Sequence, residues 1–117
     1  MSKVTYFIPN ESKENTNFSV LKSSEDMELS LANNETVIVD VFANWCGPCK
    51  MIAPQFQALS KEFPSYSFSK INLNDLSEEY MGKVTALPTF LFFKKGELVE
   101  RVIGADIDEV RAMINSL

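Results

Sequence analysis

The sequence predicts an α/β fold in which a mixed β-sheet carries helices on both faces. Strand-like and helix-like segments alternate along the chain from residue 18 onward. The run TVIVDVF at residues 36–42 is β-branched and apolar, which is typical of a central strand covered on both faces. The last two strands are separated only by KKGE at residues 94–97, which indicates an antiparallel hairpin. Together these observations predict the order β-α-β-α-β-α-β-β-α.

The first half of the chain shows clear helix signals on both sides of the central strand. Residues 18–21 form a predicted strand, and Ser23 or Ser24 caps the helix that follows it. A second helix begins near residue 46, and its apolar side chains recur at helical spacing. These side chains are Ile52, Phe56, Leu59 and Phe63. The spacing predicts an amphipathic helix that packs one face on the sheet.

The second half supplies the remaining strands and two further helices. Residues 66–73 are the next predicted strand, and Ser77 starts a short helix. Residues 89–93 and 98–102 form the two strands of the hairpin. Asp106, with a glutamate three residues later, begins the last helix as a capping box does.

Residues 1–17 are interpreted as an N-terminal extension, and residues 18–117 as one domain. The extension contains a short apolar run, VTYFI at residues 4–8, followed by the polar stretch PNESKENTN. Such a polar stretch is typical of a linker or a loose tail. The sequence leaves open whether the extension is an added edge strand or a flexible tail.

The composition excludes several classes of site. The 117 residues include two cysteines and no histidine, so a Ser/His or Cys/His nucleophile pair is impossible. Two thiolates cannot complete a structural zinc site unless two chains share the metal, and we expect no metal. The net charge is −5 without a basic cluster, which argues against nucleic acid and anionic membranes as partners. Because neither a membrane span nor a secretory signal is recognisable, we expect a cytoplasmic protein.

Cys46 and Cys49 carry the chemical prediction. They lie three residues apart at the start of a predicted helix, so their sulfurs can share one face and cycle between dithiol and disulfide. The unpaired first amides of the helix and its dipole stabilise a thiolate at Cys46, which we expect to be exposed, with Cys49 more buried. Gly47 adds no bulk to the turn, and Pro48 suits the first helical turn.

A pair of cysteines at this spacing has other interpretations. It is also half of a zinc knuckle, or two incidental cysteines. The chain offers neither a second pair nor a histidine, so redox chemistry is the favoured interpretation.

Four other residues stand out against their local pattern. Asp40 interrupts the central strand, where burial should raise the pKa of its carboxyl, and a proton acceptor for the second cysteine is a sensible role. The alternative interpretation of Asp40 is that the strand lies at the edge of the sheet and has one face exposed to solvent. Pro88 precedes a strand, either as a cis proline or as a plain strand-entry residue. Trp45 adjoins the first cysteine and is expected to be a surface contact, and Lys70 is expected to snorkel from an apolar strand.

The motif WCGPCKMIAP, with Asp40 upstream and LPTF downstream, closely resembles the thioredoxin family over residues 18–117. The resemblance implies the thioredoxin fold, with a central mixed five-stranded β-sheet flanked by four α-helices. Three positions depart from the commonest pattern. Phe42 stands where many members have tryptophan, Asn44 replaces an acidic or small residue, and Asn74 stands where aspartate is common. The first two could alter which partners dock.

The same resemblance implies roles for the residues of the site. Cys46 is the attacking thiolate, and Cys49 is the buried resolving thiol. Asp40 and Lys70 form the buried pair that moves the proton of Cys49.

The resemblance also implies a surface for substrates. Pro88 is the cis proline that faces the disulfide, and the backbone of Leu87 pairs with substrate as a β-strand does. The flat apolar docking rim consists of Trp45, Gly47, Pro48, Leu87, Gly104 and Ala105.

We therefore predict a thiol–disulfide oxidoreductase, a monomer that reduces disulfides of protein substrates through a mixed-disulfide intermediate. The resemblance implies a flavin-containing, NADPH-dependent thioredoxin reductase as electron donor and no cofactor bound to this chain. Two alternatives remain. An oxidant or isomerase of the same fold typically has histidine where Pro48 stands, and a non-catalytic binding module would use the rim but not the sulfurs.

Overall fold

The computed structural model describes residues 17–117, which form five strands, four α-helices and one 3₁₀ turn, η2. In chain order they are β1 (Phe18–Leu21), α1 (Ser24–Asn33), β2 (Thr36–Phe42), α2 (Gly47–Glu62), β3 (Ser67–Asn72), η2 (Leu73–Asp75), α3 (Glu78–Met81), β4 (Thr89–Lys94), β5 (Glu97–Ile103) and α4 (Ile107–Asn115). Within this range, no helix combines the length and the apolar character that crossing a bilayer requires.

The five strands form one mixed sheet, as predicted, and their order within it is β1-β3-β2-β4-β5. β1, β3 and β2 are parallel, whereas β4 runs antiparallel to both of its neighbours, β2 and β5. β2 lies at the centre, and all of its residues except Phe42 are buried, so the prediction of a strand covered on both faces is confirmed. The register places Asp40 between Lys70 of β3 and Phe90 of β4.

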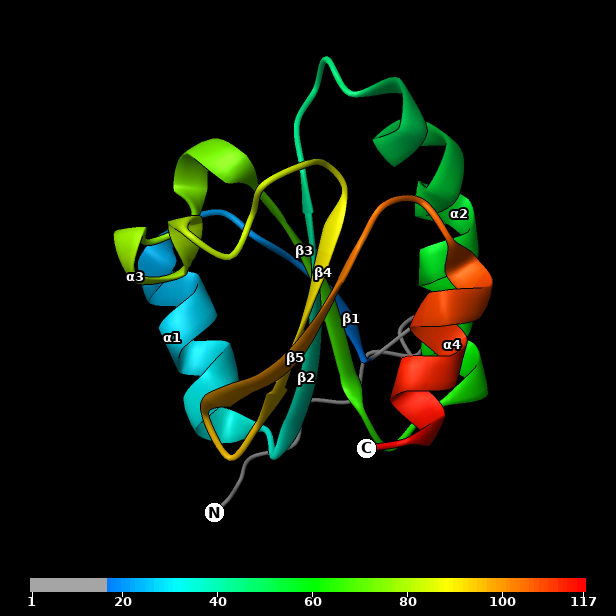
Figure 1. Cartoon of the computed structure of the whole chain (residues 1–117). Helices are drawn as coiled ribbons and strands as arrows, with labels where there is room; N and C mark the ends of the chain where they lie inside the picture. The colour runs from blue at the N-terminus through cyan, green and yellow to red at the C-terminus, as the bar shows by residue number, and fades with distance from the viewer. Residues whose placement is uncertain (1–16) are drawn as a thin grey trace, which may run out of the picture.

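Helices cover both faces of this sheet. Figure 1 shows α1 and α3 on one side and α2 and α4 on the other. On the α2 side, the ring of Phe56 lies 5.2–6.2 Å, centroid to centroid, from the rings of Phe18, Phe68 and Phe90. Full burial of such a side chain contributes about 1.5–3 kcal/mol. The packing therefore holds α2 against the sheet and supports the loop that leads from β2 into α2.

The predicted starts of α1 and α4 are confirmed by their caps, whereas Ser77 precedes α3 without a side-chain cap bond. The side chain of Ser23 accepts a hydrogen bond from the amide of Asp26 at 3.0 Å, and that of Asp106 accepts one from the amide of Glu109 at 3.1 Å. Each bond satisfies one amide that the first turn of a helix leaves unpaired.

Three strands have boundaries that differ from the sequence prediction. β3 covers residues 67–72 and not 66–73, and it ends at residue 72 because the side chain of Asn72 accepts a hydrogen bond from the amide of Asn74 and turns the chain into η2. The hairpin strands extend to Lys94 and Glu97, which pair directly. Lys95 and Gly96 both have positive φ, at 53° and 83°, so two residues suffice for the turn.

The predicted run at residues 4–8 lies outside the described residues. Asn17, placed by the prediction at the end of the extension, is bound to the domain. Its side-chain amide lies 2.8 Å from the carbonyl oxygen of Ser60 and 2.9 Å from that of Tyr66, and its own carbonyl accepts from the amide of Phe68 at 2.7 Å. These contacts connect the start of β1 to the loop between α2 and β3.

Candidate redox site

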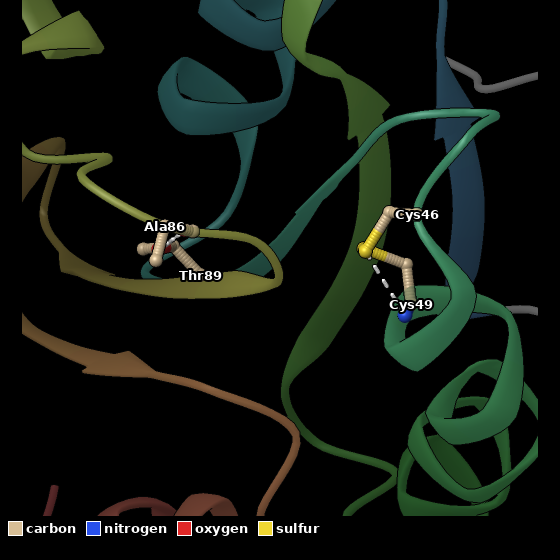
Figure 2. The surroundings of a disulfide bond; sticks show 4 residues. All are labelled: Cys46, Cys49, Ala86 and Thr89. Atoms are coloured by element: carbon tan, nitrogen blue, oxygen red, sulfur yellow. Dashed lines mark hydrogen bonds between the residues drawn. A yellow bond between two sulfur atoms is a disulfide. The ribbon is translucent and has the colours of Figure 1, made fainter.

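The two cysteines form a disulfide where the loop after β2 enters α2 (Figure 2). Cys46 is the N-cap of α2, and Cys49 lies in the first turn, with 5.3 Å between their Cα atoms. The Cys46 sulfur accepts a hydrogen bond from the Cys49 amide at 3.2 Å. A donor at this position stabilises negative charge, so the same sulfur would be stabilised as a thiolate after reduction.

Both cysteines are buried in this oxidised structure. Cys46 is 4% exposed and Cys49 is 3% exposed, so the expectation of an exposed Cys46 is wrong for the disulfide form. The two residues pack with Ala43, and the side chains of Phe42 and Leu87 lie against this cluster. Apolar contacts from two separate loops thus cover a sulfur that sequence position alone placed at the surface.

Asp40 is buried in the central strand β2. The residue is 2% exposed, and Oδ1 of its carboxyl has no hydrogen-bond partner among the described residues. Burial raises the pKa of Asp40 from 3.8 to about 7, and the positive charge of Lys70 acts in the opposite direction. The carboxyl is therefore poised to exchange a proton near neutral pH.

A cavity of about 210 Å³ brings Asp40, Lys70 and Cys49 together. Lys70 is half-buried, and its ammonium lies 5.3 Å from the centroid of the Phe42 ring. Among residues 17–117, the only ion pairs within 4.0 Å are those of Arg111, so Lys70 and Asp40 are neighbours without a direct ion pair. A larger hollow of about 960 Å³ lies along β1 and α1 and contains neither cysteine, so it is not part of this site.

The loop before β4 contacts the cysteines through Leu87 and is joined to the loop after β5. The Leu87–Pro88 peptide bond is cis, as the resemblance implies, and the Thr89 hydroxyl donates to the Ala86 carbonyl at 2.6 Å across this turn (Figure 2). The amide of Gly104 donates to the Pro88 carbonyl at 2.8 Å. This bond joins the loop before β4 to the loop after β5.

The positions of the predicted docking rim differ in exposure. Trp45 is 78% exposed, which matches the expected surface contact. The other exposed members are Gly47, Pro48 and Ala105, whereas Leu87 and Gly104 are half-buried. Pro88 itself is buried.

The sequence prediction did not include two residues of this region. Met51 is 77% exposed in α2, two residues after Cys49, although its neighbour Ile52 is buried. An apolar residue on the polar side of an amphipathic helix is the signal that could have identified it. Phe42 was noted only as a departure from the family pattern, and its contact with Lys70 has no local sequence signal.

Comparisons with known proteins agree with this geometry. Residues 18–116 match the family model described as Thioredoxin, a range that contains both cysteines and every element from β1 to α4. Thioredoxin-1 of Saccharomyces cerevisiae is 36% identical over 94 residues, which cover 80% of this chain and 91% of that protein. Thioredoxin of Oryctolagus cuniculus is 41% identical over 97 residues, which cover 82% and 92%. A crystal structure of reduced Schistosoma mansoni thioredoxin matches with a TM-score of 0.79 and 41% identity, covering 86% of this chain and 97% of that one.

Proposed function

Because this chain belongs to the thioredoxin family and is a thiol–disulfide oxidoreductase that reduces protein disulfides, we propose the role of each residue in its site. The sulfur of Cys46 attacks one sulfur of a substrate disulfide, and the other substrate sulfur leaves as a thiolate. Cys49 then attacks the sulfur of Cys46, which releases the second substrate thiol and forms the internal disulfide. Two electrons pass to the substrate. The observation that carries this assignment is the position of Cys46 as the N-cap of α2.

Asp40 takes the proton of Cys49 in this scheme. The support is that both line one cavity, that Asp40 is buried, and that its pKa of about 7 lets it accept a proton at neutral pH. Lys70 contributes a positive charge that favours the ionised carboxylate, since it lowers the pKa that burial raises.

Substrates dock on the surface around the disulfide. Trp45, Gly47 and Pro48 supply its exposed side next to α2, and Gly104 and Ala105 supply its side next to β5. Leu87, which packs against the cysteines, offers its backbone to an extended substrate segment beside the cis Pro88. The exposed Trp45 supports this role, because large aromatic side chains are frequent anchors in interfaces.

Electrons reach the oxidised protein from a flavin-containing, NADPH-dependent thioredoxin reductase. The chain itself carries no cofactor, works in the cytoplasm and acts as a monomer. The support for this proposal is that the chain belongs to the thioredoxin family, whose members act on protein disulfides and depend on a reductase.

Trapping the mixed disulfide tests the order of attack. With Cys49→Ser, Cys46 still attacks but nothing displaces the product, so disulfide-linked substrate complexes accumulate on non-reducing gels. Cys46→Ser is the matched control, and it should trap none. Trapping by Cys46→Ser alone would reverse the two roles. If the double-serine variant retained the full cellular function of the protein, the sulfurs would be dispensable and the chain would act as a binding module.

A further inference from the structure

The side chains of Asp40, Phe42 and Lys70 lie on one face of the sheet. Asp40 and Phe42 are two residues apart on β2, so their side chains point to the same side. The register of β2 with β3 places Lys70 directly beside Asp40. All three residues line the cavity that Cys49 also lines.

Within this cavity, the ammonium of Lys70 has few partners. It lies 5.3 Å from the centre of the Phe42 ring, which is within the range of a cation–π contact. Among residues 17–117, no carboxylate is within 4.0 Å of it. The negative face of the ring and the more distant charge of Asp40 are therefore its attractive partners among these residues, and a long lysine side chain without such partners extends its charged end into bulk water.

We propose that Phe42 is a positioning residue, whose ring holds the Lys70 ammonium inside the cavity and so keeps its positive charge beside Asp40. Without the ring, Lys70 extends into water and its charge is screened from the carboxyl. The inference rests on the proposed role of Asp40 as the proton acceptor for Cys49. Under this proposal, the residue at position 42, where tryptophan is common, influences the pH at which the carboxyl of Asp40 loses its proton.

The surroundings of Asp40 contain few other groups that could produce the same effect. From α2, Cys49 and Lys50 line the cavity, but Lys50 is exposed. From β3 the facing group is Lys70, and from β4 the paired residue is Phe90, which does not titrate. Among the described residues, Lys70 is the one cation whose charge lowers the pKa of Asp40.

The experiment compares two substitutions at residue 42 and measures the titration of Asp40. Phe42→Leu keeps an apolar side chain and removes the π face, whereas Phe42→Trp keeps a stronger π face. Each is made in the natural sequence and in a Lys70→Met background. Carbon NMR of the side-chain carboxyl of Asp40 follows its protonation in the oxidised protein, where neither cysteine titrates.

We expect Phe42→Leu to move the midpoint of Asp40 upward by about half a pH unit, the scale of a partly exposed cation–π contact. Phe42→Trp should leave the midpoint unchanged or lower it. In the Lys70→Met background, Phe42→Leu should have no effect, because the charge that the ring holds is gone.

Two results would overturn the proposal. One is an unchanged or lowered midpoint in Phe42→Leu. The other is an equal upward shift in both backgrounds, which would mean that residue 42 acts on Asp40 only through packing and burial. The measurement needs no catalysis, so it is separate from the trapping test: loss of trapping in Cys49→Ser would remove the proposed function while the titration still reports on Phe42.

Discussion

At the scale of single residues, the buried carboxyl of Asp40 makes the stability of the fold depend on pH. Its pKa is about 7 in the folded protein, against 3.8 for the ordinary carboxyl, and the largest cause is burial. Below pH 3.8 the carboxyl is protonated in both the folded and the unfolded chain. Between these two values the unfolded chain loses the proton and the folded protein keeps it, so the free energy of unfolding falls as pH rises. Above pH 7 the carboxyl is ionised in the folded protein too, and the loss of unfolding free energy has reached its full size.

Replacing Asp40 with asparagine should therefore stabilise the protein in a pH-dependent way. A difference of one pH unit between the folded and unfolded pKa values corresponds to about 1.4 kcal/mol, so the gain in unfolding free energy at about pH 8 should approach 4 kcal/mol. At about pH 4 the gain in unfolding free energy should be small. Disulfide reduction at neutral pH should be slower, because asparagine cannot accept the proton of Cys49. Denaturant unfolding of both oxidised proteins at several pH values measures this difference. A gain that did not change with pH would mean that Asp40 is not the group that titrates.

At the scale of elements, the site depends on the loops that join the strands to the helices. Gly104, between β5 and α4, has a φ of 106°, which side-chain-bearing residues rarely adopt. Gly104→Ala should lower the free energy of unfolding by about 1–2 kcal/mol, since the added Cβ meets no neighbour but the backbone conformation is unfavourable. Gly47→Ala is the matched control: its Cβ also meets open space, and its φ is not positive. Equal stability of the two variants in thermal or denaturant unfolding would remove this explanation.

Asn17 connects two elements that are far apart in the sequence. Its side-chain amide reaches the carbonyl oxygens of Ser60, Phe63 and Tyr66, at the end of α2 and in the loop before β3. Asn17→Ala leaves these partly buried carbonyls without that donor, so we expect a loss of about 1–3 kcal/mol in denaturant unfolding. Asn115→Ala, at the exposed end of α4, should change stability little. If both variants unfold alike, the contacts of Asn17 contribute nothing.

At the scale of the whole molecule, the disulfide and the fold are linked by a thermodynamic cycle. If the folded protein holds its disulfide more tightly than the unfolded chain does, oxidation stabilises the fold by the same amount. The thiolate of a reductase receives only the donors at the start of the helix. Pro48 supplies no charge, and the chain has no histidine. A histidine cation next to the cysteines would stabilise the thiolate and hence the reduced form, and this chain has no such cation.

The oxidised protein should consequently melt at a higher temperature than the reduced one. About 30 mV in potential corresponds to about 1.4 kcal/mol for a two-electron couple, and each kcal/mol shifts Tm by roughly 4–8 °C in a domain of about this size. Calorimetry of both forms in matched buffers measures the difference. The double variant Cys46→Ser/Cys49→Ser should melt at one temperature in both buffers. A reduced form that melts higher would favour the oxidant alternative.

The features that the sequence predicted correctly depend on neighbours along the chain. The helix caps at Ser23 and Asp106 involve residues three apart, and the burial of residues 36–41 follows from the composition of one strand. The placement of Cys46 and Cys49 at the start of α2 is equally local. The function followed because a motif of this specificity combines several such local features, and the family model covers the same residues.

The features that the sequence did not predict involve side chains from separate elements. The burial of Cys46 comes from packing with Phe42 and Leu87, and Leu87 lies in a loop some forty residues away in the sequence. The position of the Lys70 ammonium depends on the register of β3 against β2 and on the ring at the end of β2. Such contacts leave no periodic pattern in either segment, because they arise only when the sheet and helices are assembled. Local sequence was therefore enough to predict the cysteine pair and the family, whereas the burial and electrostatic surroundings of Cys46, Asp40 and Lys70 depend on how α2, the loops and the sheet pack together.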